Sequence, residues 1–197
     1  MELTIDADGW CTTARRVESP NQDARPDDAR PHPDRPDGAD ADADPVSLVV
    51  VHCISLPPGE FGGPYIEDLF LNRLDPAAHP YFVDVAPLRV SAHFVVRRDG
   101  ELLQCVPTVR RAWHAGVSSW RGRSRCNDFS VGIELEGCNV LPYEDVQYAV
   151  LRALVAALKR RHPVADVVGH SDIAPGRKVD PGACFDWKRL PDAVRPD

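Results

Sequence analysis

The feature that most constrains the fold is a short run of apolar, mostly β-branched residues, Ser47–His52. Pro45 precedes this run, and a stretch rich in Gly and Pro, Leu56–Pro64, follows it. A continuous apolar run of this length between breakers is typical of a buried strand, because branched side chains pack well on a pleated surface. The run therefore predicts a central strand of a sheet, with His52 at its end.

A hairpin is predicted further along the chain. Two strand-like segments, Ser91–Val96 and Glu101–Val106, flank Asp99 and Gly100. An Asp-Gly pair supplies the positive φ that a tight turn between antiparallel strands requires. We therefore expect the two segments to pair with each other.

Ser130–Glu136 alternates in polarity, which is the two-residue period of a strand. The alternation places Ile133 and Leu135 on one face, and Glu134 and Glu136 on the other. Both carboxylates are thus expected to leave this strand on the same side.

Two helices and a last strand complete the predicted elements. Pro64 is expected to begin a short helix over Tyr65–Leu74, and the helical spacing of apolar residues predicts a longer helix over Tyr143–Arg161. A short apolar segment, Ala165–His170, indicates a strand that ends, like the first, in a histidine. From this order of elements we expect an α/β fold, a mixed sheet flanked by helices.

Charge is concentrated in one part of the chain. The net charge is −7, and the stretch from Pro20 to Pro45 holds eight Asp against three Arg. Within it, Asp23–Asp44 has almost no large apolar side chain and cannot offset the entropy of ordering, so we expect a disordered acidic insertion near residues 23–45. A length of 197 residues suits a single domain over residues 1–197, which includes this insertion. The chain has no basic stripe that would bind nucleic acid.

The N-terminal residues indicate a cytoplasmic protein. Met1–Trp10 carries three carboxylates where an export signal needs basic residues and an apolar core. No apolar stretch approaches the roughly 18–20 residues of a membrane span, so no membrane partner is expected. The six cysteines include no C-x-x-C pair and are expected to be free thiols. The sequence leaves the oligomeric state open, with a monomer favoured.

Two histidines at predicted strand ends suggest a metal site. They are His52 and His170, and Asp180 follows the second within the same motif. Two imidazoles and one carboxylate suit zinc (Zn2+), and three protein ligands leave the fourth position open, as in catalytic zinc sites. The spacing alone leaves another interpretation open, in which each histidine only packs at the end of its strand.

Seven short segments occur in a defined order along the chain. They are Val50–His52, Leu56–Pro64, Leu88–His93, Arg111–Gly116, Cys126–Ser130, Gly132–Gly137 and Gly169–Gly182. Together they resemble the AmpD-type N-acetylmuramyl-L-alanine amidases, within the wider superfamily of zinc amidases and peptidoglycan-recognition proteins. The resemblance runs from about Gly9 to Trp187 and is interrupted near Pro33–Asp44. It implies zinc-dependent hydrolysis of the bond between muramic acid and L-alanine, in cytosolic cell-wall recycling.

The resemblance also implies roles for individual residues. It assigns zinc to His52, His170 and Asp180, and it marks Glu134 and Lys178 as catalytic. A carboxylate beside zinc can take a proton from water, and an ammonium can stabilise an oxyanion. As alternatives, Lys178 could be only a salt-bridge partner of Asp180, and a strand glutamate could simply face solvent. We expect Glu136 to be the glutamate that faces solvent.

The substrate that the resemblance implies is a 1,6-anhydro-muramyl tripeptide, whose stem carries free carboxylates. Such a ligand needs fixed cations in the cleft, and arginine supplies them with bidentate geometry. Arg89 and Arg125 lie in or beside the matched segments and are the candidates. The other arginines nearby are expected to face solvent: Arg97, Arg98, Arg121 and Arg123.

Aromatic residues near the same motifs complete the candidate substrate contacts. Trp113 and His114 are expected to line the sugar or peptide groove, and Tyr65 to lie near the metal. Core packing is the alternative for all three. His93 is expected to be structural. Cys53 follows the first ligand where related amidases tend to have Asn, and a thiol is a poorer hydrogen-bond partner.

Two rival functions would use the same fold. A non-catalytic module that binds peptidoglycan or muropeptides usually lacks a zinc ligand, whereas here all three candidate ligands are present. A phage-type lytic amidase would use the same metal residues on intact cell wall. The sequence shows neither an export signal nor wall-binding repeats, which favours a small muropeptide as substrate.

Overall fold

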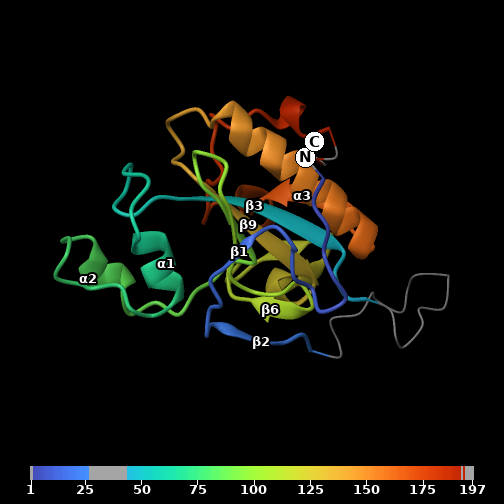
Figure 1. Ribbon diagram of the computed structural model, residues 1–197, viewed down its shortest axis with the longest axis horizontal. Helices are drawn as coiled ribbons and strands as arrows, with labels where there is room; N and C mark the ends of the chain where they lie inside the picture. The colour runs from blue at the N-terminus through green and yellow to red at the C-terminus, as the bar shows by residue number, and fades with distance from the viewer. Residues whose placement is uncertain (1, 27–43, 192, 194–197) are drawn as a thin grey trace.

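The computed structural model describes residues 2–26, 44–191 and 193 (Figure 1). Its centre is a six-stranded sheet with the order β1-β5-β4-β9-β3-β10. In chain order these strands are β1 (Arg15–Arg16), β3 (Leu48–Ile54), β4 (Phe94–Val96), β5 (Leu102–Gln104), β9 (Ser130–Glu136) and β10 (Asp166–Gly169). Two small sheets accompany it, one of β2 (Gln22–Ala24) with β6 (Arg110–Ala112), the other of β7 (Ser119–Trp120) with β8 (Arg123–Ser124).

The predicted central strand is β3. It lies between β9 and β10, and both neighbours run parallel to it. Residues 48–52 of β3 are buried, but the strand continues to Ile54, so His52 lies inside the strand and not at its end. Only the β4–β5 pair is antiparallel among the pairs of the six-stranded sheet in the described residues. The expected α/β fold with a mixed sheet is therefore confirmed.

The predicted hairpin joins β4 to β5, with Val96 opposite Leu102. The backbone N of Arg97 donates to the carbonyl O of Glu101 at 2.9 Å, and Gly100 has a φ of 89°. A Cβ on Gly100 would also come within 2.5 Å of the Val146 side chain. Both the backbone conformation and the close approach therefore require glycine in this turn.

The longest helix, α3 (Asp145–Arg161), covers one face of the sheet (Figure 1). Glu144 and Gln147 form a capping box at its N-terminus, which is why it begins two residues later than predicted. Its apolar side packs on alternate residues of the strands. The shared core includes Val49 and Val51 of β3, Ile133 and Leu135 of β9, and Leu151, Leu154 and Leu158 of α3.

The opposite face of the sheet is covered by shorter elements. The alternation along β3 turns Leu48 and Val50 away from α3, into a small core with Phe129 and Ile173. His52 follows the same alternation and faces this side. The elements here are α1 (Tyr65–Phe70), α2 (Phe82–Val85), α4 (His170–Ile173) and the 3-10 turn η2 (Cys126–Asp128). The other 3-10 turn, η3 (Trp187–Arg189), lies beside α3, where Trp187 packs against the shared core.

Helix α1 begins at Tyr65 after Pro64, as predicted, but it ends at Phe70 and does not reach Leu74. Asn72 has a φ of 59°, a left-handed conformation that a continuing α-helix does not allow. The helix packs with α2 on the sheet through a separate core around Phe82 and Val95.

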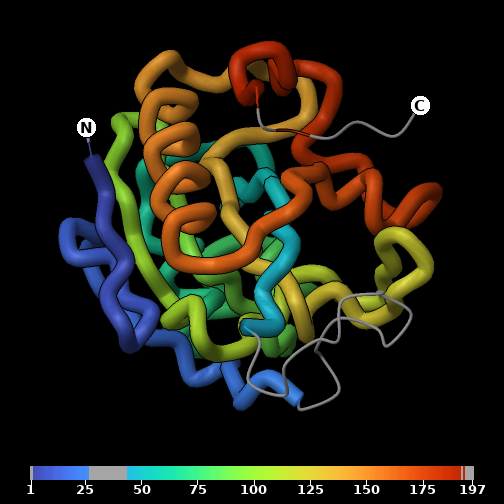
Figure 2. Tube along the Cα trace, turned by 90° about the vertical axis from the view of Figure 1, so that its right-hand side faces the viewer, coloured from blue at the N-terminus to red at the C-terminus, as the bar shows by residue number. Residues whose placement is uncertain are grey.

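Ordered structure reaches into the predicted acidic insertion from both sides. Gln22–Ala24 forms β2 against β6, and Figure 2 shows this N-terminal part of the chain in blue along one edge of the molecule. Arg25 donates to backbone carbonyls, and Asp44 contacts Nδ1 of the buried His162. Residues 23–26 and 44, at the margins of the predicted insertion, therefore belong to the folded structure, because charged side chains there find buried partners. The disorder of the insertion itself stays a prediction. Residues 27–43 lie outside the described residues.

The expected exposure of Glu136 and Arg97 is wrong as well. Their side chains are 2% and 8% exposed and form an ion pair of 2.9 Å. Glu136 also accepts from the backbone N of Gly62 and of Arg98. The loop after β3 folds over the end of β9 and removes this carboxylate from solvent. Of the other arginines expected to face solvent, Arg121 does so, whereas Arg98 and Arg123 are half-buried.

No helix in the part of the chain that the structure describes is long and apolar enough to cross a bilayer.

Candidate active site

Strand register brings the first two polar side chains together. β3 and β9 are parallel, and His52 lies directly opposite Glu134. Residues opposite each other on neighbouring strands point to the same face of the sheet. The carboxyl ends of β9, β3 and β10 also meet at one edge, because these three strands are parallel. This edge is where α/β folds hold ligands.

The chain that follows the next strand, β10, supplies the other two candidate ligands. His170 is the first residue of α4, directly after β10, whose Gly169 lies opposite Val51 of β3. The chain then turns back, and the backbone N of Ser171 donates to the carbonyl O of Asp180 at 2.9 Å. This bond holds Asp180 against the beginning of α4, beside His170.

Three donor atoms converge at this edge of the sheet. Nδ1 of His52 lies 2.9 Å from Nδ1 of His170, and Oδ2 of Asp180 lies 3.2 and 3.0 Å from these nitrogens. Among the described residues, no other group of His, Cys, Asp and Glu comes as close together. Two facing imidazole nitrogens at this distance need a proton or a cation between their lone pairs, and the carboxylate oxygen beside both favours a positive centre. The donor set therefore fits a divalent cation, and it is one that catalytic zinc sites use.

Hydrogen bonds on the far side of each imidazole orient it toward this centre. Nε2 of His170 lies 3.2 Å from the carbonyl O of Ala115, and a carbonyl can only accept. Neutral His170 therefore carries its proton on Nε2 and directs the lone pair of Nδ1 at the centre. Nε2 of His52 lies 2.9 Å from Nδ1 of His114, whose Nε2 in turn lies 3.2 Å from Oγ of Ser130.

The electrostatics keep His52 and Asp180 in the form that binds a metal. Burial lowers the pKa of His52 to about 4, so its imidazole is neutral at pH 7. Burial on its own would raise the pKa of Asp180, but hydrogen bonds with His170 and His52 outweigh it and hold this pKa well below its usual range. A neutral imidazole and a carboxylate need no proton removed before they coordinate a cation.

Glu134 stands next to this group with an incomplete set of partners. Its Oε2 is buried and has no hydrogen-bond partner among the described residues. Burial, and then the negative charge of Asp180, raise the pKa of Glu134 well above its ordinary value, while Lys178 acts in the opposite direction. A buried carboxylate oxygen without a donor is suited to hold a water or a proton.

Lys178 is exposed and lines the same cleft as Glu134. The ion pairs of Asp180 in the described residues are with His52 and His170, and none is with Lys178. The interpretation of Lys178 as only a salt-bridge partner of Asp180 therefore has no support in this geometry.

The cleft around these residues has a volume of about 420 Å³. Its floor is polar and consists of the three candidate ligands with Glu134 and Lys178. Its walls are mainly apolar and come from the loop after β3, from α1 and α2, and from the segments after β6 and β9. The wall residues include Leu56, Phe70, Tyr81, Val85, Leu88, Trp113, His114 and Asn139.

Two of the predicted substrate contacts, Trp113 and His114, lie in this cleft. Trp113 is half-buried, and its Nε1 donates to Asp23 at 3.2 Å. Both ring nitrogens of His114 are engaged within the protein, with His52 and Ser130, so its imidazole is not free to bind substrate in this geometry.

The other three predicted contacts do not line the cleft. Tyr65 packs against Phe82, with ring centroids 4.8 Å apart, in the core between α1 and α2. Arg125 precedes η2 and forms an ion pair of 2.8 Å with Asp128. Arg89 is exposed, and its guanidinium donates to carbonyls of its own loop, although both its neighbours in the chain line the cleft.

Sequence reasoning missed several wall residues. Asn139 lies three residues after β9 and accepts from Sγ of Cys53 at 3.2 Å. Its place just beyond the carboxyl end of a parallel strand is a signal that could have identified it. Tyr81, Val85 and Leu88 belong to a region without clear periodicity, and only the packing of α1 and α2 brings them to the cleft.

Comparison with known proteins adds a family to this geometry. The family described as N-acetylmuramoyl-L-alanine amidase matches residues 42–183, a range that contains all three candidate ligands together with Glu134 and Lys178. The chain is similar to the 1,6-anhydro-N-acetylmuramyl-L-alanine amidase AmpD of Citrobacter freundii, with 55% identity over 191 residues, which cover 96% of this chain and 94% of that protein.

Solved structures agree with this similarity. The crystal structure of a selenomethionine derivative of AmpD has a TM-score of 0.83 and 56% identity, and the match covers 93% of this chain and 96% of that one. A complex of the Escherichia coli amidase AmiD with anhydro-N-acetylmuramic acid-L-Ala-D-gamma-Glu-L-Lys has a TM-score of 0.59 and 30% identity, and the match covers 81% of this chain and 62% of that one.

Proposed function

The chain belongs to the N-acetylmuramoyl-L-alanine amidase family, and we propose that it is a zinc enzyme that hydrolyses the amide bond between 1,6-anhydro-N-acetylmuramic acid and L-alanine. The proposed substrate is a small muropeptide, and the proposed setting is cell-wall recycling in the cytoplasm. The AmpD relatives are named for this reaction, and the complex of AmiD contains a ligand of this class.

One observation carries the proposal. His52, His170 and Asp180 present three donor atoms to one point, at the floor of a cleft that also contains Glu134 and Lys178. A binding module needs a cleft but neither a metal site nor an unpartnered carboxylate beside it. The combination therefore favours hydrolysis over binding alone.

The protein's own residues divide the work of the reaction. A bound zinc ion would supply Lewis acidity, which lowers the pKa of a coordinated water and polarises the amide carbonyl. Glu134 accepts the proton of the attacking water and later returns it to the nitrogen of the leaving alanine. Lys178 offers an ammonium to the negative charge that develops on the amide oxygen.

The raised pKa of Glu134 suits the proposed exchange of a proton. Burial disfavours its carboxylate, whereas Lys178 and a cation held by Asp180 favour it. A carboxylate whose pKa lies above its ordinary value is a stronger base than an exposed one, which suits the uptake of a proton from water.

The cleft also supports contacts to the rest of the substrate. Trp113 offers an aromatic surface to the sugar or the stem peptide at the wall. Arg89 has no ion pair among the described residues and is exposed between two residues that line the cleft, so we propose it for a stem carboxylate. The substrate contacts of Tyr65 and Arg125 stay predictions, because both side chains would have to move toward the cleft to make them.

The test combines metal analysis with product analysis. We expect the purified full chain to bind zinc and to release the alanine-linked peptide from a 1,6-anhydro-muramyl tripeptide, detected by mass spectrometry. The same protein should act far more slowly on intact sacculi. A protein that binds zinc and the muropeptide but releases no peptide would instead be a binding module. Preference for sacculi would indicate a lytic amidase.

A further inference from the structure

Two consecutive residues, His114 and Ala115, contact both candidate histidine ligands from behind. The imidazole of His114 lies 2.9 Å from Nε2 of His52, and the carbonyl O of Ala115 lies 3.2 Å from Nε2 of His170. The orientation of both ligands therefore depends on one short stretch of backbone. This stretch belongs to no strand or helix, so regular backbone hydrogen bonds do not hold it in place.

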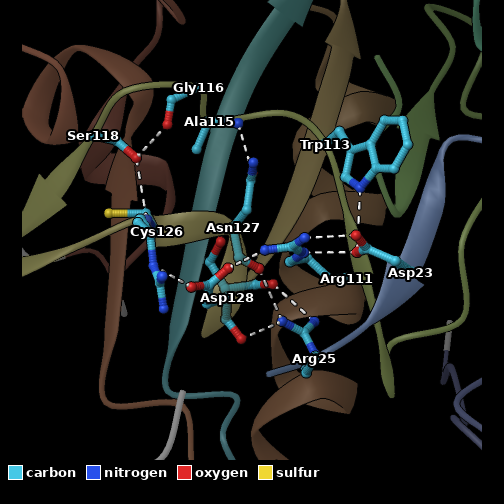
Figure 3. Close-up of polar contacts among 12 residues, drawn as sticks. Asp23, Arg25, Arg111, Trp113, Ala115, Gly116, Ser118, Cys126, Asn127 and Asp128 are labelled. Atoms are coloured by element: carbon cyan, nitrogen blue, oxygen red, sulfur yellow. Dashed lines mark hydrogen bonds and ion pairs between the residues drawn. The ribbon is translucent and has the colours of Figure 1, made fainter. Parts of the chain in front are cut away.

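The side chain of Asn127 holds the backbone N–H groups of this stretch. Oδ1 of Asn127 accepts from the backbone N of His114 at 3.1 Å and from the backbone N of Ala115 at 2.8 Å. Figure 3 shows the side chain of Asn127 pointing from η2 to Ala115. A single oxygen thus fixes the two peptide groups on either side of the His114 Cα, and the carbonyl of Ala115 follows directly after them. That carbonyl also accepts from Nη2 of Arg177 at 2.7 Å.

Asn127 is itself held firmly. Arg25 donates to the carbonyl O of Asn127 at 3.1 Å and to that of Asp128 at 3.0 Å. The Asp128 side chain, 3% exposed, pairs with Arg111 at 2.6 Å, and Arg111 also binds Asp23 (Figure 3). Two arginines therefore anchor the turn that presents Asn127.

We propose that Asn127 is a positioning residue for the metal site, which sets the orientation of His52 and His170 through the side chain of His114 and the carbonyl of Ala115. The inference rests on the proposed zinc site and adds a residue that touches neither metal nor substrate. Outer partners of this kind fix the tautomer and direction of a ligating imidazole. Asn127 differs from them in serving both histidines at once.

The required protonation pattern is consistent across the network. A cation at Nδ1 of His52 leaves the proton on Nε2, which then donates to Nδ1 of His114. His114 carries its own proton on Nε2 and donates it to Oγ of Ser130. His170 donates from Nε2 to Ala115. Every donor thus meets an acceptor in the arrangement of His114 and Ala115 that Asn127 supports.

The test measures zinc affinity by competition with a chelator of known affinity, in the full chain. Asn127→Leu should weaken zinc binding about 10- to 100-fold, the usual effect of losing an outer partner of a metal ligand. Asn127→Asp keeps an acceptor oxygen and should retain the affinity. Asn21→Leu is the matched control, since the buried Asn21 binds the carbonyl of Val90 and is not among the groups that contact the ligands.

A double variant separates positioning from general destabilisation. If Asn127 acts through His114, then Asn127→Leu and His114→Leu together should weaken zinc binding by clearly less than the product of the two single effects. Independent effects would multiply. Unchanged zinc affinity in Asn127→Leu, or a simple product in the double variant, would overturn the inference.

Failure of the proposed zinc site can be distinguished from failure of the inference about Asn127. His52→Ala should abolish tight zinc binding, and a wild type that binds no zinc would remove the proposed function before Asn127 is tested. If Asn127→Leu does not fold, the wild type still gives an answer, because linkage is reciprocal. Zinc should then slow hydrogen exchange at the amides of His114 and Ala115, and no slowing would contradict the inference.

Discussion

His52 on β3 lies directly opposite Glu134 on β9, in two parallel strands at the centre of the sheet. The register of the backbone, and not a direct bond between the side chains, sets the relation between a candidate metal ligand and the proposed base. Each residue can therefore be replaced without removing the other from its position, which makes their roles separable by experiment.

Glu134→Gln should retain zinc and lose turnover. The amide has nearly the shape of the carboxyl group but cannot accept the proton from water, and loss of a general base costs about 10²- to 10⁴-fold in rate. Zinc content by elemental analysis and the turnover number on an anhydromuropeptide check this. The exposed Glu101→Gln is the control. A near-normal rate in Glu134→Gln would remove Glu134 from the mechanism.

Zinc removal should abolish the activity, and zinc should coordinate Nδ1 of both histidines. The two Nδ1 atoms face each other at 2.9 Å, whereas the Nε2 atoms bind His114 and Ala115. Long-range nitrogen NMR of the zinc-bound protein should show the proton of His52 and of His170 on Nε2. Coordination through Nε2 of either residue would contradict this geometry. His170→Ala should lose both zinc and turnover.

Glu136→Ala should destabilise the fold strongly. It removes one of the two carboxylates that pair with the buried Arg97. Breaking a buried ion pair from one side costs about 3–5 kcal/mol, and the loss should lie toward the lower end because Glu67 still pairs with Arg97. Urea denaturation measures the free energy of unfolding. Glu101→Ala is the matched control, because its pair with Arg15 is solvent-exposed, and such pairs contribute about 0–1 kcal/mol. Equal losses in both variants would show that burial of Glu136 has no energetic consequence.

Glu67 should make stability depend on pH. Hydrogen bonds from Arg15, and then from Arg97, lower the pKa of Glu67 against the effect of burial. Its contribution is therefore complete above the unfolded pKa of about 4.3 and is lost as the pH falls through the lower folded pKa. Compared with Glu67→Gln, the wild type should be more stable by on the order of 1–3 kcal/mol at pH 7.

This difference in the free energy of unfolding should stay constant from pH 7 to about pH 5 and shrink toward pH 3. Urea denaturation of both proteins at several pH values measures it. A difference that persists unchanged at pH 3 would rule out Glu67 as the titrating group.

Gly132→Ala should weaken zinc binding through His114. A Cβ on Gly132 would lie 2.5 Å from the ring of His114 and push it away from His52. Overpacking of this kind costs about 1–3 kcal/mol of stability. Gly63→Ala is the control, because its Cβ would meet Tyr65 at an ordinary 3.4 Å. Unchanged zinc affinity in Gly132→Ala would mean that His114 does not orient its neighbour.

Local patterns in the sequence predicted the main elements well. Ser130–Glu136 forms a strand with the predicted bounds, because its two-residue alternation reports directly which side chains face the core. The hairpin and α3 follow from turn chemistry and helical spacing in the same way. The same alternation also placed Glu134 and Glu136 on one face of β9, but it could not tell that a loop far away in the chain buries Glu136.

Exposure of charged side chains was the weakest part of the prediction. Arg25 and Arg97 both look like solvent-facing residues in the sequence, and Arg25 stands in a segment without apolar neighbours. In the folded chain each has buried acceptors from distant segments, Arg25 from η2 and Arg97 from β9. Long-range hydrogen bonds of this kind leave no periodic trace in the sequence, so no local pattern predicts them.

By itself, the sequence determined which segments become strands and helices and which residue types could hold a metal, because hydrophobic period, turn residues and ligand chemistry are local properties. The tertiary structure alone decided that Nδ1, and not Nε2, of His52 and His170 faces the shared centre, and that Asn127 supports both. Those relations depend on the parallel order of β9, β3 and β10 and on a turn anchored by Arg25 and Arg111. His52 and His170 are 118 positions apart, and Arg25 and Asn127 are 102 positions apart. Only packing in three dimensions brings such distant groups within hydrogen-bond distance.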